Sequence, residues 1–153
     1  VRRISMGLRP SILDDLGIIA TMNWFCREFS LTYSSVGIQK KIDVDEALVP
    51  KSLKTVIFRI FQEALNNVAK HSNASLVSIE LTHDQRRIYL KITDNGVGFH
   101  CKPFSSPETC NTGFGLASLR ERAESLGGDL RVDSTPGHGT SINASWTLKK
   151  ILE

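Results

Sequence analysis

The 153-residue chain lacks the run of about 18 apolar residues that a membrane-spanning helix needs, and it shows no signal peptide. Its formal net charge of +3 is too small to favour binding to nucleic acid or to a membrane surface. The three cysteines, Cys26, Cys101 and Cys110, are odd in number and lack the spacing of a metal site. We therefore expect a soluble protein with no nucleic-acid partner, in a reducing compartment such as the cytoplasm.

The hydrophobic content of 41% is enough for one domain with a sizeable core. Apolar periodicity predicts an α+β fold, a two-layer α/β sandwich in which helices cover one face of a mixed sheet. The expected helices are Ser11–Tyr33, Leu53–Ser72 and Phe114–Leu126, and the expected strands are Ile38–Val44, Leu76–Thr82, Arg87–Thr93, Asp129–Ser134 and Thr140–Leu148. A loop from Gly96 to Thr112, rich in Pro, Ser, Thr and Gly, is expected to form a lid.

The run Asp94-Asn95-Gly96-Val97-Gly98-Phe99 follows a predicted strand. Its carboxylate can accept a hydrogen bond from an exocyclic amino group such as that of adenine, and its glycines let the backbone approach a ligand closely. Asp-Asn-Gly is also ordinary turn chemistry. Ile88, Leu90 and Ile92 alternate with polar residues, however, so Asp94 continues the buried face and should point inward.

The predicted helix Leu53–Ser72 carries a polar stripe beside its apolar face, formed by Glu63, Asn67, Lys70 and His71. Such a stripe is commonly a solvated flank with ordinary salt bridges. Asn67 is close to the apolar arc, where an amide is costly to bury unless something bonds it. A hydrated metal ion or a triphosphate would satisfy it.

Two further glycine-containing segments complete the pattern. Gly113-Phe114-Gly115-Leu116 begins a predicted helix, and free amide groups at a glycine-rich helix start suit an anion. Arg120, in the same helix, is expected on its solvent face. The turn Pro136-Gly137-His138-Gly139-Thr140 leads into a strand in which Thr140 has the parity of the apolar residues. Together the segments describe a pocket with an adenine end and a phosphate end.

Four of these segments, in this order, resemble the nucleotide-binding boxes of sensor histidine kinases. They are Phe61–Val68 for the N box, Asp94–Phe99 for the first glycine box, Gly113–Leu116 for the second, and Gly137–Thr140 for the closing glycine-threonine element. Together the four boxes resemble those of the Bergerat ATP-binding fold, which is shared by gyrase, the Hsp90 chaperone, histidine kinases and MutL.

Leu8-Arg9-Pro10 with Leu13-Asp14-Asp15-Leu16-Gly17 resembles a connecting segment of the kinases related to the nitrate sensor and the thermosensor of lipid desaturation. In those kinases the segment leaves the dimerisation helix and enters the catalytic domain. The resemblance implies that residues 1–10 are the end of a dimerisation helix with its connecting segment, and that residues 11–150 are the catalytic domain. Val1 in place of methionine agrees with a fragment of a longer protein.

The resemblance also implies a site for ATP and Mg²⁺. In it Asn67 holds the metal and Asp94 recognises the adenine amino group, while Glu63 orients a water or the attacking group. The other nucleotide-binding positions that it implies are Lys70, His71, Gly96, Gly98, Phe99, Gly113, Gly115, Leu116 and Thr140.

The activity implied is transfer of the ATP γ-phosphoryl group to a histidine on a dimerisation domain that this chain lacks. His71, His83, His100 and His138 all fall inside the nucleotide domain and are expected to be structural or peripheral. The implied partners are that acceptor domain, a response regulator and a second copy of the parent protein. The resemblance is also compatible with a membrane anchor elsewhere in the parent. Two alternatives stay open: an ATP-binding regulatory module without transfer, and an anti-sigma-type serine kinase, against which Leu8-Arg9-Pro10 speaks.

Overall fold

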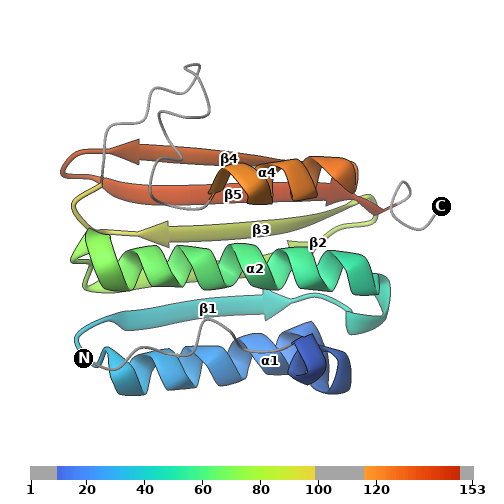
Figure 1. Cartoon of the computed structure of the whole chain (residues 1–153), viewed down its shortest axis with the longest axis horizontal. Helices are drawn as coiled ribbons and strands as arrows, with labels where there is room; N and C mark the ends of the chain where they lie inside the picture. The colour runs from blue at the N-terminus through green and yellow to red at the C-terminus, as the bar shows by residue number, and fades with distance from the viewer. Residues whose placement is uncertain (1–9, 99–115, 149–153) are drawn as a thin grey trace.

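The computed structural model of the chain describes residues 10–98 and 116–148, without the side chains of residues 10–15, 71, 72, 116 and 117. A five-stranded sheet with the order β1-β2-β3-β5-β4 forms one layer (Figure 1). The β1 and β2 strands are parallel, and the other neighbours are antiparallel, so the predicted mixed sheet is confirmed. The strands are β1 (Gly37–Asp43), β2 (Leu76–His83), β3 (Arg87–Asp94), β4 (Gly128–Thr135) and β5 (Gly139–Thr147).

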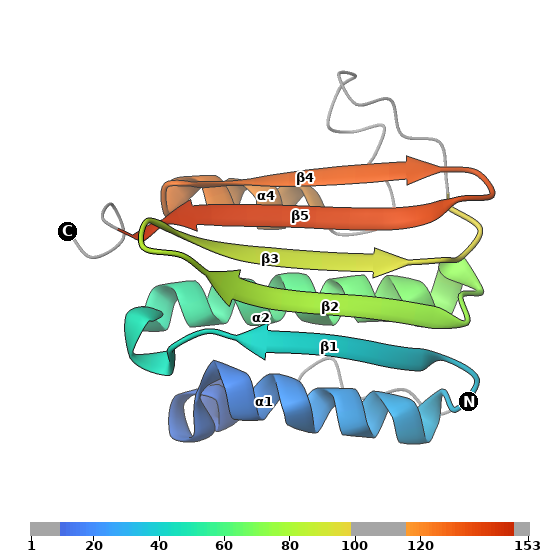
Figure 2. The ribbon, with the colours of Figure 1, turned by 180° about the vertical axis from the view of Figure 1, so that it is seen from behind.

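The helices α1 (Pro10–Thr32), α2 (Lys51–Asn67) and α4 (Leu116–Ser125) form the second layer. Helix α2 lies over the middle of the sheet and α4 lies over β4 and β5, whereas α1 packs beside α2 near the β1 edge. Figure 2 shows the opposite face of the sheet, which no described helix covers. None of the described helices combines the length and the apolarity needed to cross a membrane.

The core follows from the alternation in the strands and the broad apolar face of α2. Val77, Ile79 and Leu81 of β2 are fully buried, and each is followed by a residue on the uncovered face. The Trp146 indole fixes α4 to the sheet, because its Nε1 donates to the Ala123 carbonyl oxygen over 3.2 Å. The uncovered face is polar, as one solvated side of a mixed sheet should be.

The structure corrects two features of the predicted helices. The expected continuous helix Ser11–Tyr33 is broken at Gly17, which has φ 85° and ψ 173°. The expected helix Leu53–Ser72 is α-helical only to Asn67 and then continues as the π-helical η2 (Val68–Ser72). A π-helical turn at the end of a helix shifts the side chains that follow it, and such turns are frequent at functional sites.

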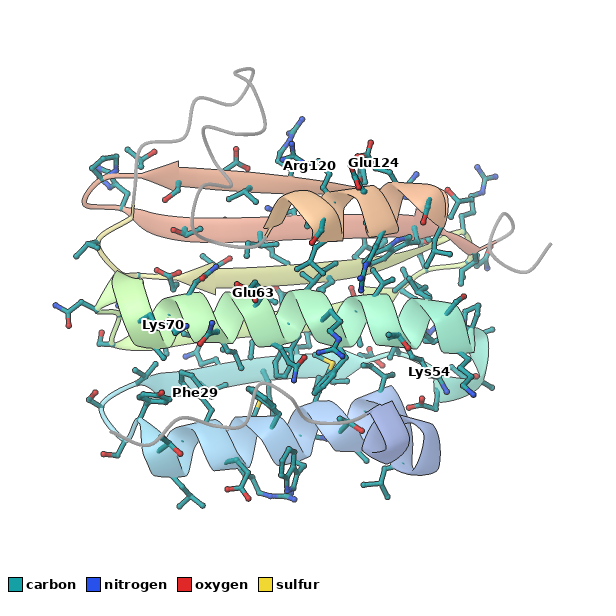
Figure 3. The ribbon with its side chains drawn as sticks, viewed as in Figure 1. Phe29, Lys54, Glu63, Lys70, Arg120 and Glu124 are labelled. Carbon is teal, nitrogen blue, oxygen red and sulfur yellow. The ribbon has the colours of Figure 1, made fainter. Side chains whose placement is uncertain are left out.

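Arg120 is a further correction, since it was expected on the solvent face of its helix. Its side chain is partly buried, and its Nε donates to the Leu130 carbonyl oxygen over 3.2 Å. Figure 3 shows Arg120 and Glu124 on α4. Arg120 therefore joins α4 to β4, whereas Glu124 is exposed.

Candidate functional site

The segments singled out in the sequence meet at one end of the sheet. The end of β3, the turn between β4 and β5, and the C-terminal end of α2 with η2 lie at the same end of the domain in both ribbon views (Figures 1 and 2). The start of α4 faces the same side (Figure 1). Segments that are far apart in the sequence are thus placed around one region.

Asp94 is the last residue of β3 and continues its buried face, as the alternation predicted. The side chain is partly buried, and its Oδ1 accepts a hydrogen bond from the Gly96 amide over 2.8 Å. Burial raises the pKa of the Asp94 carboxyl, and hydrogen bonds from the backbone amides of Gly96 and Thr140 offset only part of that rise. The site thus holds a carboxylate that is partly withdrawn from water.

Two hydroxyl groups follow this carboxylate across the sheet, the first on the neighbouring β5 and the second on β4 beyond it. Thr140 of β5 pairs with Asp94 on one side and with Ser134 of β4 on the other. The Ser134 and Thr140 hydroxyl oxygens are 2.8 Å apart, and Ser134 Oγ also donates to the Gly139 carbonyl oxygen. Sequence reasoning missed Ser134, although its parity with the buried Leu130 and Val132 was available as a signal.

Two glycines allow the first glycine segment and the β4–β5 turn to touch through their backbones. Gly98 has φ 68° and Gly139 has φ 81°. A Cβ at Gly98 would collide with the Thr135 carbonyl oxygen, and a Cβ at Gly139 would collide with the carbonyl oxygen of Asp94. Because only glycine fits both the positive φ and the close approach, these positions fix the backbone that carries Asp94.

Gly139→Ala should therefore destabilise the domain more than Gly137→Ala does. The two glycines have nearly the same φ, 81° and 82°, but a Cβ at Gly137 would meet nothing within 4 Å. We expect Gly137→Ala to cost about 1–2 kcal/mol for the left-handed backbone, and Gly139→Ala about 1–3 kcal/mol more for the collision. Urea denaturation measures both, and equal losses would show that the contact with Asp94 has no effect.

Asn95, which lies between Asp94 and Gly96 of the motif, links β3 to β2 through side-chain hydrogen bonds. Its Oδ1 accepts hydrogen bonds from the Ser75 and Leu76 amides, each over 3.0 Å, and its Nδ2 donates to Ser75 Oγ over 3.0 Å. The start of β2 is therefore held against the end of β3. This asparagine has a structural role, which its place in the motif did not reveal.

The end of α2 supplies a second group of polar side chains. Glu63 is partly buried, and burial raises its pKa although the nearby Lys70 charge lowers it in part. Lys70 is exposed on η2 (Figure 3). Asn67 is partly buried at the last position of α2, and no residue in the described ranges bonds to its side-chain amide. A raised pKa at Glu63 is typical of a group that takes part in proton transfer.

The expected site residues are brought together as far as the structure describes them. Asp94, Gly96, Gly98 and Thr140 form one wall, and Glu63, Asn67 and Lys70 stand at the end of α2 and on η2. Phe99, Gly113 and Gly115, the side chains of His71 and Leu116, and most of the expected lid lie outside the described residues. Within the described ranges, no three His, Cys, Asp or Glu side chains are grouped to hold a metal ion.

Comparisons with known proteins agree with this arrangement. Residues 53–150 match the family described as histidine kinase-, DNA gyrase B-, and HSP90-like ATPase. The signal transduction histidine-protein kinase/phosphatase UhpB of Salmonella typhimurium is 38% identical over 147 residues, which are 95% of this chain and 27% of that protein. The oxygen sensor histidine kinase NreB of Staphylococcus carnosus is 33% identical over 142 residues, 93% of this chain and 40% of that protein. The chain thus spans well under half the length of these relatives.

Solved structures share the fold. The histidine kinase domain of the blue-light activated histidine kinase from Erythrobacter litoralis EL346 has a TM-score of 0.70 at 19% identity, over 88% of this chain and 62% of that one. The mycobacterial sensor histidine kinase MprB has a TM-score of 0.58 at 22% identity, over 85% of this chain and 93% of that one. The two-layer arrangement of Figure 1 is therefore the arrangement of known catalytic domains.

Proposed function

Because this chain belongs to the family of histidine kinase-, DNA gyrase B- and HSP90-like ATPases, we propose that it is the ATP-binding catalytic domain of a sensor histidine kinase. The observation that supports this most directly is the partly buried Asp94 carboxyl at the end of β3, which lies at the same end of the domain as the C-terminal end of α2, where no described residue bonds to the side-chain amide of Asn67. A carboxylate for adenine and an amide for a metal-bound phosphate suit the two ends of ATP.

Asp94 recognises the nucleotide base in this proposal. Its carboxylate accepts a hydrogen bond from the adenine amino group, while the Gly96 and Thr140 amides hold the carboxyl in place. Gly98 and Gly139 keep the backbone of this wall closely packed. This close packing preorganises the wall for the nucleotide, which lowers the entropy cost of binding.

Asn67 suits a magnesium ion that accompanies the triphosphate. Magnesium prefers oxygen ligands and keeps several waters, so one amide oxygen with the phosphates is a sufficient protein contribution. The amide of Asn67 has no hydrogen-bond partner in the described part of the chain, and it is partly buried. Bound there, the ion would neutralise phosphate charge.

Asn67→Ala should remove most of the gain that magnesium brings to ATP binding. We expect the magnesium-dependent part of the affinity to fall by at least about tenfold. Loss of a residue that only hydrogen-bonds to a metal ligand already costs about that much, and loss of the ligand itself should cost no less. Titration calorimetry with and without magnesium measures this, and Asn66→Ala, the neighbouring amide, is the matched control. An unchanged magnesium dependence, with native circular dichroism, would show that Asn67 is only structural.

The reaction we propose is phosphoryl transfer to a histidine of an acceptor domain. A nitrogen–phosphorus bond forms between the imidazole and the γ-phosphorus as the bond from that phosphorus to the leaving ADP oxygen breaks. Glu63, whose pKa is raised by burial, accepts a hydrogen bond from the N–H of the imidazole, which orients the ring, and takes this proton as the nitrogen–phosphorus bond forms at the other ring nitrogen. Most of the catalysis is positioning of the two reactants.

The partners follow from the same proposal, since the chain spans only 27% of UhpB and 40% of NreB. They are the parent's dimerisation and histidine-acceptor domain, reached through residues 1–10, and a response regulator that receives the phosphoryl group. The parent acts as a homodimer. The catalytic domain works in the cytoplasm, where ATP is, with or without a membrane anchor elsewhere in the parent.

Radioactive ATP tests the proposal. The chain alone should not label itself, since none of its histidines is expected to be a phosphate acceptor. Mixed with the separately made dimerisation helices of its parent, it should transfer phosphate to them weakly, because the tether that gives a high effective concentration is missing. The product should be labile to acid and stable to base, as phosphohistidine is.

Three outcomes would contradict it. Strong labelling of the chain itself or an acid-stable phosphoserine on a partner would favour the serine-kinase alternative. ATP binding without transfer to the dimerisation helices would favour the regulatory module. Each result separates one alternative from the histidine kinase.

A further inference from the structure

Helix α1 is two helical segments that meet at Gly17. Residues 10–16 and 18–32 are both helical, but Gly17 between them is not, with φ 85° and ψ 173°. The first turns, dark blue in Figures 1 and 2, run across the axis of the rest of α1. The break is an abrupt change of direction rather than a gentle bend.

A carboxylate that is distant in the sequence caps the second helical segment at this break. Glu46, in the 3₁₀ helix η1 (Glu46–Leu48), accepts hydrogen bonds from the amides of Ile18 over 2.8 Å and Ile19 over 3.1 Å, one at each carboxylate oxygen. These amides begin the second segment and have no partner within a helix. Glu46 is 28 residues from Ile18, so a tertiary contact, not a local cap, starts the segment.

The same carboxylate is bound to α2. Lys54 Nζ is 2.7 Å from Glu46 Oε2, and both side chains are partly exposed. Burial alone would raise the pKa of Glu46, but the hydrogen bonds from Lys54, Ile18 and Ile19 more than offset it and leave the pKa lowered. The Glu46 carboxylate is therefore in its charged form, and it connects α1, η1 and α2. We call this contact of Gly17, Ile18 and Ile19 with Glu46 and Lys54 the joint.

Only glycine at position 17 allows the Glu46 carboxylate to approach this closely. A Cβ there would lie 2.6 Å from the Glu46 carboxyl carbon, and the positive φ disfavours any other residue. Its carbonyl oxygen accepts a hydrogen bond of 2.6 Å from the hydroxyl of Thr21, which is fully buried. The joint is thus fixed from the glycine side as well as from the carboxylate side.

We propose that Glu46 is a positioning residue for phosphoryl transfer: it sets the angle at which residues 10–16 leave the ATP-binding domain, and thereby where the acceptor histidine is held relative to ATP. This rests on the proposed function, in which residues 1–10 lead to the acceptor domain. In both ribbon views the start of α1 lies at the opposite end of the domain from the C-terminal end of β3, which is Asp94, so Glu46 acts on geometry and not by contact with the nucleotide (Figures 1 and 2). A small error in such an angle displaces a distant reactant.

The angle can be measured in the chain itself by electron spin resonance. Spin labels at Ser11→Cys and Leu31→Cys, one on each segment, report the distance across the joint; Leu31 is 79% exposed. Cys101 and Cys110 are replaced by serine, whereas Cys26 is buried, which raises its pKa to about 11, and stays unlabelled. We expect one narrow distance distribution that broadens in Glu46→Ala and is intermediate in Glu46→Gln.

Asp45→Ala is the matched control, because the Asp45 carboxylate caps η1 through the Ala47 amide and forms no hydrogen bond with the described residues of α1. It should leave the distribution narrow. The affinity of each variant for ADP should equal that of the unaltered chain, which shows that the nucleotide wall is folded. A distribution that stays narrow and unshifted in Glu46→Ala would overturn the proposal.

The consequence for transfer is tested in the parent kinase. There Glu46→Ala should lower kcat for autophosphorylation by about tenfold to a hundredfold with an unchanged KM for ATP, as expected when reactants are misaligned. Full kcat in that variant would overturn the positioning role. A parent that does not label any histidine even when unaltered would instead refute the proposed function, while the spin-label distances would still test the joint.

Discussion

Asp94→Asn should weaken the binding of ATP and ADP by about tenfold to 150-fold. A hydrogen bond to a charged acceptor contributes about 1.5–3 kcal/mol, and each 1.4 kcal/mol is a factor of ten in affinity. Asparagine keeps the size of the side chain and one oxygen but removes the charge. Calorimetry of the two proteins measures the difference, and equal affinities would refute the assignment of Asp94 to adenine.

The same substitution should not destabilise the nucleotide-free domain. Burial raises the pKa of Asp94, so the folded state favours its protonated form; this contribution to stability is present at low pH and is lost as the pH rises through the raised pKa. At neutral pH the uncharged asparagine avoids that loss. The free energy of unfolding of Asp94→Asn should therefore equal or exceed that of the unaltered chain, as is common for residues that serve binding at a cost in stability.

Asp133→Asn is the matched control for Asp94→Asn. Asp133 is exposed on β4, pairs with Ser141, and lies on the face of the sheet that the described helices leave uncovered. The substitution makes the same change of charge in the same sheet. We expect it to leave nucleotide affinity unchanged within about twofold, since its charge is on the solvated opposite face of the sheet, where the high dielectric constant of water weakens its effect.

Local periodicity was sufficient to predict most of the fold. The expected strand Arg87–Thr93 differs from β3 by one residue, because Ile88, Leu90 and Ile92 alternate strictly with polar residues. The apolar face of α2 was equally clear, since its residues recur every three or four positions. Alternation also fixed the phase of Asp94, which is why its partial burial could be predicted.

Features that depend on distant residues could not be predicted in this way. The first amides after the break at Gly17 are capped by the Glu46 carboxylate, which is 28 residues from Ile18, and no window of local sequence contains both. The pairing of Asp94 with Thr140 requires β5 to lie beside β3, and the parity of Thr140 gives its face but not its neighbour. Gly98 was expected to shape a pocket, whereas its close approach to Thr135 became visible only with the strands in place.

Glu63→Gln should slow phosphoryl transfer by about 10²–10⁴-fold, the usual contribution of a positioned acid or base. Burial raises the pKa of Glu63 and the Lys70 charge opposes that rise, so the carboxylate is a stronger base than an exposed glutamate. Glutamine fills the same space but cannot take a proton. Since Glu63 is not assigned to the adenine, ATP affinity should change by no more than about twofold.

Transfer of phosphate from ATP to the separately made dimerisation helices measures the effect, with Glu124→Gln, an exposed carboxylate on α4, as the matched control (Figure 3). The pH dependence gives a second readout. A base must be deprotonated to act, so the rate of the unaltered chain should rise as the pH increases through the raised pKa of Glu63, and this rise should be absent in Glu63→Gln. If Glu63→Gln transfers phosphate at the unaltered rate with the same pH profile, Glu63 only supports the structure of α2, and the attacking group is oriented by the acceptor domain itself.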